Sequence, residues 1–183
     1  MPVYADNDAS LGCGLLNKGN TCFINATIQC LSRVKCLRAT LDHSKYNDRL
    51  ITTTYSKVLD EWNRLSRALL VETGHLDPHR FIETIRVVCN ENSIPIKLGS
   101  QNDAGEFLSH LLEFLHEATA AKVDMKVNGQ VTSDKDKIAE TCYNSFKKEY
   151  EDKFSPIVDL FNGISIEGMS EPQGGAISST LVP

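Results

Sequence analysis

The feature that most constrains this chain is the stretch 14–31, in which a glycine-containing loop runs directly into an apolar helix. Its first half combines glycines with asparagines, residue types that tolerate tight turns and positive φ. In its second half the apolar residues recur with helical spacing, at Phe23, Ile24, Ile28, Leu31 and Val34. This spacing predicts a helix over residues 22–35 that is apolar around most of its circumference and therefore buried.

Cys22 lies where this loop and this helix meet. Thr21 is a suitable N-cap, which places Cys22 in the first helical turn. There the unpaired backbone N–H groups and the helix dipole favour a thiolate over a thiol. A thiolate beside a loop that can supply oxyanion donors is suited to nucleophilic catalysis. The alternative is a buried structural cysteine, which is the commoner role of a free cysteine.

A second motif follows downstream, Gln101-Asn102-Asp103-Ala104-Gly105-Glu106-Phe107-Leu108. It resembles the Gln-x-Asp-x-x-Glu-Phe-Leu box of the ubiquitin-specific proteases, papain-like thiol hydrolases that cleave ubiquitin from its conjugates. The first stretch resembles the same family's cysteine box, Gly-Leu-x-Asn-x-Gly-Asn-Thr-Cys-aromatic-x-Asn. The resemblance covers residues 14 to about 166 and implies an α+β papain-like fold, of which this chain holds mainly the helical, thumb-like lobe with little strand.

The resemblance also implies roles for individual residues. Cys22 matches the nucleophile, and Asn17 matches the side chain that joins the Cys22 backbone N–H in the oxyanion hole. The alternative for Asn17 is a turn asparagine that satisfies its own backbone. Asp103 and Glu106 match acidic residues that meet the Arg-containing tail of ubiquitin, with Asp103 the better candidate, and Gln101 is expected to brace the loop near the active site. The alternative for the two carboxylates is stabilisation of a solvated helix start.

The catalytic base is the missing part of this pattern. The family's histidine stands in a Gly-His-aromatic context far downstream, and none of the five histidines here has that context. No paired Cys-x-x-Cys knuckles follow Gly163 either. We therefore expect the N-terminal portion of a catalytic domain, either a fragment or a natural short form. The alternatives are a non-catalytic short form that binds ubiquitin or a protein partner, and a helical interaction module.

Composition narrows the remaining classes of function. A formal net charge of -5 without a basic cluster argues against nucleic-acid binding. No apolar run approaches a membrane span, and no secretory signal is recognisable, so we expect a cytoplasmic or nuclear protein. Six cysteines without a Cys-x-x-Cys pair predict reduced thiols, no zinc and no cofactor. Ubiquitin and ubiquitinated proteins are the partners that the resemblance implies, and the oligomeric state stays open.

Periodicity and capping signals complete the outline. The expected helices span residues 52–72, from Asp77-Pro78 to about 90, from a capping box at Ser100 and Asp103 to about 121, and from a second capping box at Ser133 and Asp136 through Ile138, Cys142, Phe146 and Tyr150. Residues 127–131 are a hairpin or a loop, and residues 156–166 are expected to form one strand. The predicted organisation is a flexible lead-in over 1–12, the catalytic-domain portion over 13–166, and a disordered tail over 167–183.

Overall fold

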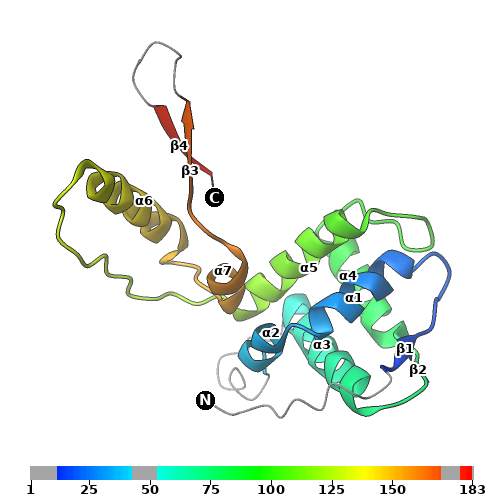
Figure 1. Cartoon of the computed structure of the whole chain (residues 1–183). Coiled ribbons are helices and arrows are strands. Elements are labelled where there is room, and N and C mark those ends of the chain that lie inside the picture. Colours follow the sequence, from blue (N-terminus) through cyan, green and yellow to red (C-terminus); the bar gives the residue numbers. More distant parts are fainter. Residues whose placement is uncertain (1–11, 43–52, 170–177, 183) are drawn as a thin grey trace. The chain divides into compact units, whose positions relative to one another are not determined.

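The computed structural model describes residues 12–42, 53–169 and 178–182, and the chain divides into two units, residues 1–119 and 120–183. The first unit contains β1 (Gly14–Leu15), α1 (Cys22–Ser32), α2 (Lys35–Thr40), α3 (Thr54–Val71), β2 (His75–Leu76), α4 (His79–Glu91) and α5 (Ala104–Thr119), shown in Figure 1. The second contains α6 (Asp134–Tyr150), α7 (Pro156–Phe161), β3 (Ser165–Met169) and β4 (Ser178–Val182). The lead-in predicted for residues 1–12 lies almost wholly outside the described residues.

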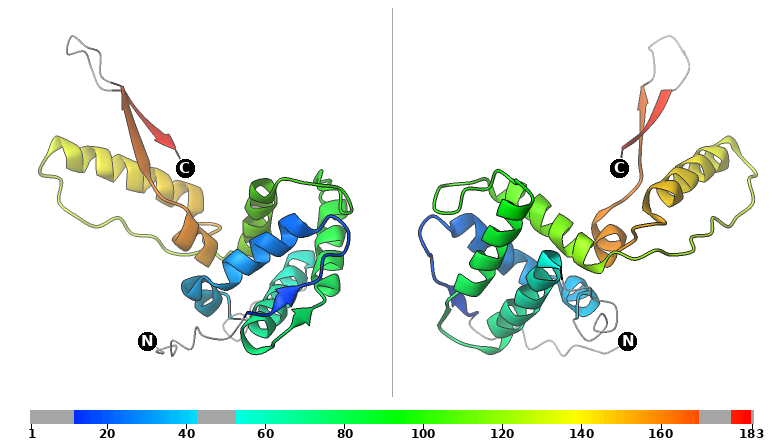
Figure 2. Two further views of the ribbon diagram at one scale, coloured as in Figure 1. Left: turned by 45° about the vertical axis from the view of Figure 1, so that its right-hand side comes forward. Right: turned by 180° about the vertical axis from the view of Figure 1, so that it is seen from behind.

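The first unit is built around α3, which packs against α1, α4 and α5 (Figure 2). Its apolar stripe follows the predicted helical spacing, and Trp62 is fully buried, as expected for a core residue. Other large side chains that are fully buried in this unit include Ile24, Ile28, Leu37, Leu41, Leu59, Leu65, Leu69, Phe81, Ile85, Phe107, Leu111, Phe114 and Leu115. This core fixes α1, which carries Cys22, against α3 and α5.

The predicted helix over 22–35 is interrupted in the structure. Helix α1 ends at Ser32, and Val34 takes an extended conformation (φ -77°, ψ 97°) before α2 begins at Lys35. Neither proline nor glycine marks this break, so a pattern of apolar residues alone could not locate it. The turn directs Leu37 into the core and leaves Cys36 exposed.

Helices α3 and α4 agree with the predicted helices to within one or two residues. Thr53 and Ser56 form a capping box at the start of α3. Helix α4 starts at His79, one residue later than an N-cap at Asp77 implies, although the Asp77 carboxylate still accepts the His79 N–H at 2.9 Å. The buried Glu61 joins these helices, because its carboxylate binds Arg64 at 2.8 Å and Arg80 of α4 at 2.6 Å.

The cap predicted for the start of α5, Ser100, is wrong. The side chain of Asp103, not that of Ser100, caps the helix, since its Oδ1 accepts the Glu106 N–H at 2.9 Å. The Ser100 hydroxyl instead donates to the Lys97 carbonyl at 2.7 Å. The helix ends at Thr119, slightly before the predicted end.

The second unit departs further from the sequence-based outline. A helix, α7, and not a strand, occupies residues 156–161, because Ser155 caps it and Pro156 opens it. Strands β3 and β4 form an antiparallel pair, where a disordered tail was expected from residue 167. Residues 127–131 form a loop, one of the two predicted alternatives.

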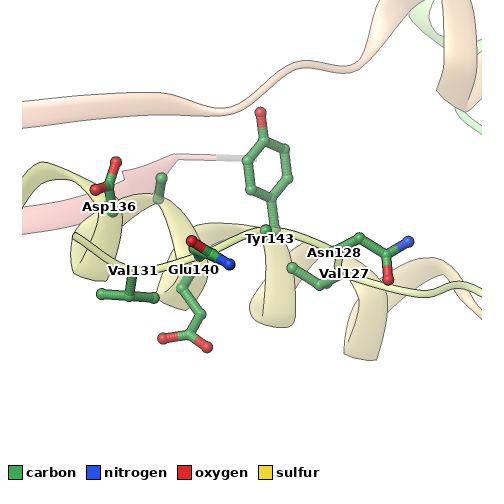
Figure 3. A pocket seen from close by; sticks show the side chains of 9 residues that line it. Val127, Asn128, Val131, Asp136, Glu140 and Tyr143 are labelled. Carbon is green, nitrogen blue, oxygen red and sulfur yellow. The ribbon is translucent and has the colours of Figure 1, made fainter. Parts of the chain in front are cut away.

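Helix α6 begins at the predicted capping box of Ser133 and Asp136. Its inner face holds Cys142, but Ile138, expected inside, is 38% exposed. A cavity of about 190 Å³ lies between the helix and the 127–131 loop, with Asp136, Glu140 and Tyr143 on its helical side (Figure 3). It contains no residue of either sequence motif.

The capping box of α6 yields a pH-dependent prediction. Hydrogen bonds from the Thr132 hydroxyl, and then from the backbone of Thr132 and from Ser133, lower the pKa of Asp136 from 3.8 to about 2. A depressed folded-state pKa stabilises the helix start fully above about pH 4, and this stabilisation is lost as the pH falls through about 2. A carbon-13 titration of the Asp136 carboxyl should therefore show a midpoint near 2. Thr132→Val should raise that midpoint toward the ordinary value, and an unchanged midpoint would show that the Thr132 hydroxyl does not hold the carboxylate.

Candidate active site

The segment that precedes Cys22 is held on one side by β2. Strands β1 and β2 are parallel, with the Gly14 N–H donating to the Gly74 carbonyl at 2.8 Å and the Leu16 N–H donating to the Leu76 carbonyl at 2.9 Å. A side chain at position 14 would place its Cβ 3.0 Å from the His75 ring, which is why glycine fits there. These bonds fix the strand that leads into the Cys22 loop.

Two amide side chains of α1 hold the other side of this segment. The Gln29 Nε2 donates to the Cys13 carbonyl at 2.8 Å. One turn earlier, the Asn25 Nδ2 donates to the carbonyls of Leu15 and Leu16 at 3.3 and 3.2 Å. These bonds tie the backbone of residues 13–16 to the helix that carries Cys22. The loop half and the helix half of the cysteine box are thus held together by hydrogen bonds. Neither Asn25 nor Gln29 was predicted to tie the loop to the helix, although their i, i+4 spacing places them on one helix face.

The loop itself closes around the Asn17 carbonyl. The Asn17 Oδ1 accepts three hydrogen bonds, from the Gly19 N–H (3.1 Å), the Thr21 N–H (3.1 Å) and the Thr21 hydroxyl (3.2 Å). Gly19 and Asn20 take positive φ values of 87° and 53°, which the tight turn requires. The Asn17 NH₂ group has no hydrogen-bond partner within the part of the chain that the structure describes. Asn17 is thus a turn asparagine whose donor end is still available.

Cys22 is the first residue of α1 and is exposed. Thr21 occupies the predicted N-cap position, but its side chain accepts no hydrogen bond from the first turn of the helix. Its hydroxyl accepts the Lys18 N–H at 2.9 Å instead. The Cys22 N–H likewise has no hydrogen-bond partner among the described residues. A thiol, a backbone donor and an amide donor are thus available at one helix start.

Two further contacts attach the loop to later parts of the chain. The Lys18 ammonium binds the Asp77 carboxylate at 2.9 Å, and this hydrogen bond is the main cause that lowers the pKa of Asp77. The Asn20 Nδ2 donates to the Gly99 carbonyl at 2.8 Å. This bond joins the loop to the segment before the second motif. Gln101 was expected to brace the loop in this way, and its side chain makes no hydrogen bond to the described residues.

The two motifs meet through α1 and α5. The Phe23 and Phe107 rings pack edge to face, with centroids 5.3 Å apart and an interplanar angle of 84°. The Thr27 hydroxyl lies 3.5 Å from the Ala104 carbonyl. Gln101, Asp103 and Glu106 are exposed at the start of α5. One oxygen of the Asp103 carboxylate caps the helix, while the Glu106 carboxylate makes no hydrogen bond to the described residues.

Comparison with known proteins agrees with this arrangement. A model of the ubiquitin carboxyl-terminal hydrolase family matches residues 13–177. The chain belongs to this family. Membership implies the papain-like cysteine protease fold, and the mainly helical structure is consistent with it.

Individual relatives in this hydrolase family match the chain over a small part of their own length. Ubiquitin carboxyl-terminal hydrolase 43 of Mus musculus is 34% identical over 127 residues, 69% of this chain and 11% of the relative. Ubiquitin carboxyl-terminal hydrolase Usp2 of Drosophila melanogaster is 33% identical over 110 residues, 58% of this chain and 11% of the relative. Ubiquitin carboxyl-terminal hydrolase 11 of Saccharomyces cerevisiae is 28% identical over 180 residues, 89% of this chain and 24% of the relative.

The histidine base of a papain-like hydrolase is not found beside Cys22 in residues 12–42 and 53–169. His75 lies in β2, next to Gly14, and His79 opens α4 at 4.0 Å from Glu83. His110 and His116 lie on α5, and His43 is outside the described residues. No hydrogen bond joins Cys22 to any of the described histidines. Those residues also contain no cluster of three or more His, Cys, Asp or Glu side chains that could hold a metal ion, and none of their helices is long and apolar enough to cross a membrane.

The six thiols of this hydrolase-family chain should differ in reactivity. Cys22, Cys30 and Cys36 are exposed, whereas Cys13, Cys89 and Cys142 are buried, and burial raises the pKa of Cys89. Cys22 is the first residue of the 11-residue helix α1, whereas Cys30 lies in the last turn of that helix and Cys36 in the first turn of the six-residue helix α2. Because the longer helix follows Cys22, we expect Cys22 to be alkylated fastest near neutral pH. Mass spectrometry of iodoacetamide-treated protein, thiol by thiol, measures these rates. Faster reaction of Cys36 at low pH would show that the start of α1 does not activate Cys22.

Proposed function

We propose that this chain carries the nucleophile and the oxyanion hole of a thiol-dependent hydrolase that cleaves peptide and isopeptide bonds at the C-terminus of ubiquitin. Cys22 is the nucleophile, and its N–H and the Asn17 NH₂ are the oxyanion donors. The observation that carries the proposal is the orientation of Asn17, whose carbonyl is bound by three loop donors while its NH₂ is free. We further propose that residues 13–166 are the N-terminal portion of the catalytic domain and hold mainly its helical, thumb-like lobe.

The chemistry follows from these groups. The Cys22 thiolate attacks the carbonyl carbon at the end of the ubiquitin tail, an S–C bond forms, and the π electron pair moves to the oxygen. The two N–H donors stabilise the negative oxygen in the tetrahedral intermediate. Its collapse breaks the C–N bond, and the leaving amine takes a proton from a protonated histidine, a group that the described residues beside Cys22 do not supply. Water then attacks the thioester, which releases ubiquitin with a free carboxylate and restores the thiol.

Recognition of the ubiquitin tail falls to the exposed start of α5. The Asp103 carboxylate uses one oxygen for the helix cap and keeps the second, and the Glu106 carboxylate is free of described partners. Both can bind the guanidinium groups of an Arg-containing tail. Gln101 precedes them in the sequence and adds a third exposed polar side chain at the start of α5. The free state of the cysteines supports action in the cytoplasm or nucleus.

A second candidate function is a short form that binds ubiquitin, or another protein partner, without cleaving it. It is favoured by one observation, that no described histidine is hydrogen-bonded to Cys22. Asn17 and Thr21 weigh against it, because a binding module has no need of an oriented donor next to an exposed thiol.

Ubiquitin aldehyde separates the two candidates. The Cys22 sulfur adds to its carbonyl carbon, the C=O π bond breaks, and the thiol proton passes to the oxygen, so no leaving group and no base are needed. The catalytic proposal expects tighter binding of ubiquitin aldehyde than of ubiquitin itself, measured by calorimetry. Cys22→Ala should abolish this preference, and Cys30→Ala, a change at another exposed thiol of α1, should not. Equal affinity for both ligands would favour the binding-only candidate.

Substitution of Asn17 tests the oxyanion hole directly. Asn17→Asp retains an oxygen that can accept the three loop hydrogen bonds but replaces the NH₂ donor with a negative oxygen. We expect this variant to fold normally and to lose the aldehyde preference by about 10-fold or more, because the oxygen of the adduct loses one hydrogen-bond donor and faces a negative oxygen instead. Asn17→Ala should lose the preference and also lower the melting temperature, because the loop loses its acceptor. An unchanged preference in Asn17→Asp would assign Asn17 to the turn alone.

A further inference from the structure

Thr21 is placed between the two groups that the proposed chemistry needs. It directly precedes Cys22 and is only 2% exposed. It supplies two of the three hydrogen bonds to the Asn17 Oδ1, one from its N–H at 3.1 Å and one from its hydroxyl at 3.2 Å. The same hydroxyl accepts the Lys18 N–H at 2.9 Å. A single buried residue, through its N–H and its hydroxyl, therefore closes the loop from Asn17 to Cys22.

The use of this hydroxyl differs from that of an ordinary N-cap. A threonine at the start of a helix normally accepts a hydrogen bond from the second or third residue of the helix. The Thr21 side chain makes no such bond and turns back toward the loop. Two consequences follow: the donors at the start of α1 are left open, and the Asn17 carboxamide is held by its oxygen. A flipped carboxamide would bring its NH₂ against the Gly19 and Thr21 N–H donors, which cannot accept a hydrogen bond.

We propose that Thr21 is a positioning residue that holds the Asn17 carbonyl in the loop and thereby directs the Asn17 NH₂ toward the carbonyl oxygen under attack by Cys22. This inference rests on the proposed function, since the oxyanion role of Asn17 belongs to it. Thr21 does not contact the reacting atoms and acts through Asn17. Of the two hydrogen bonds that Thr21 gives to Asn17, the one from the hydroxyl is the one that a substitution can remove, so valine and serine are the informative replacements.

The first measurement follows the Asn17 amide and needs no ligand. In the full chain labelled with nitrogen-15, the Asn17 NH₂ should give one sharp pair of signals, because its oxygen is held by three donors. Thr21→Val, which keeps the shape and the N–H but removes the hydroxyl, should broaden or shift this pair. Thr21→Ser should restore it. Melting curves of both variants show whether the fold survives, and an Asn17 pair that is identical in wild type and Thr21→Val overturns the proposal.

The second measurement compares ubiquitin aldehyde with ubiquitin. We expect Thr21→Val to lower the preference for the aldehyde by about 10-fold with little change in affinity for ubiquitin, and Thr21→Ser to recover it to within about twofold. An equal loss of affinity for both ligands would mean that Thr21 is merely structural and would overturn the proposal. If wild type shows no aldehyde preference, the proposed function fails, and the Asn17 signals alone then decide whether Thr21 orients the amide.

Discussion

Residues 1–183 by themselves are expected to release the fluorophore from a ubiquitin-tail substrate about 100- to 10,000-fold more slowly than a family member with its histidine in place. The reason is the geometry around Cys22. The Cys22 thiol stands at the start of α1, but no hydrogen bond joins it to a described histidine. Without an imidazole, the amine that leaves has no acid to protonate it.

The measurement is a fluorescence progress curve with the purified chain at high concentration. Cys22→Ala gives the background rate, and Cys30→Ala serves as the matched control because it removes another exposed thiol of the same helix. Rapid turnover that disappears in Cys22→Ala would contradict the prediction and would require a base within this chain. His75 would then be the first residue to replace, since it lies in β2 beside the strand that enters the Cys22 loop.

Phe107→Ala should cost about 3–5 kcal/mol in the free energy of unfolding, a large part of the stability of a domain of this size. Phe107 is fully buried on α5, and its ring meets that of Phe23, the residue after Cys22, at a centroid distance of 5.3 Å. The substitution would leave a cavity between α1 and α5, where the packing of the two motifs against each other holds Cys22 in place.

Urea unfolding measures this loss, and a double-mutant cycle with Phe23→Leu separates the ring contact, worth about 0.5–1.5 kcal/mol beyond the buried area. Phe107→Leu is the conservative comparison and should cost less. Val87→Ala, a substitution on the exposed side of α4, should change stability by no more than about 0.5 kcal/mol. A cost below about 1 kcal/mol for Phe107→Ala would show that the two motifs are held together by other contacts.

Local sequence signals were sufficient to predict a helix wherever the residues that determine it all lie within that helix or its caps. The stripes of α3 and α4 and the capping box of α6 were predicted because each depends on residues within a few positions of one another. The same logic failed at Ser100, where Asp103 competes for the same helix start and is nearer to it. It also failed at residues 156–161, because a short apolar run fits a strand and a helix equally, and the Ser155-Pro156 signal decided for the helix.

Local signals could not predict contacts between segments that are distant in the sequence. Strand β4 exists because it pairs with β3, and the Gly- and Ser-rich composition of the tail does not reveal that partner. The break between α1 and α2 likewise has no glycine or proline to mark it; in the folded chain Leu37 of α2 is fully buried.

At the candidate active site, the sequence by itself determined the chemical inventory: a cysteine at a helix start, a glycine-containing loop before it, and an asparagine within reach of it. The tertiary structure decided how these groups are used. It turned the Thr21 hydroxyl into the loop, engaged the Asn17 oxygen and left its nitrogen free. It also joined Asn20 to Gly99 and Phe23 to Phe107 across a long separation in sequence. The physical reason is that a residue type fixes which hydrogen bonds and apolar contacts are possible, whereas the packing of α1 against α3 and α5 selects which of them are made.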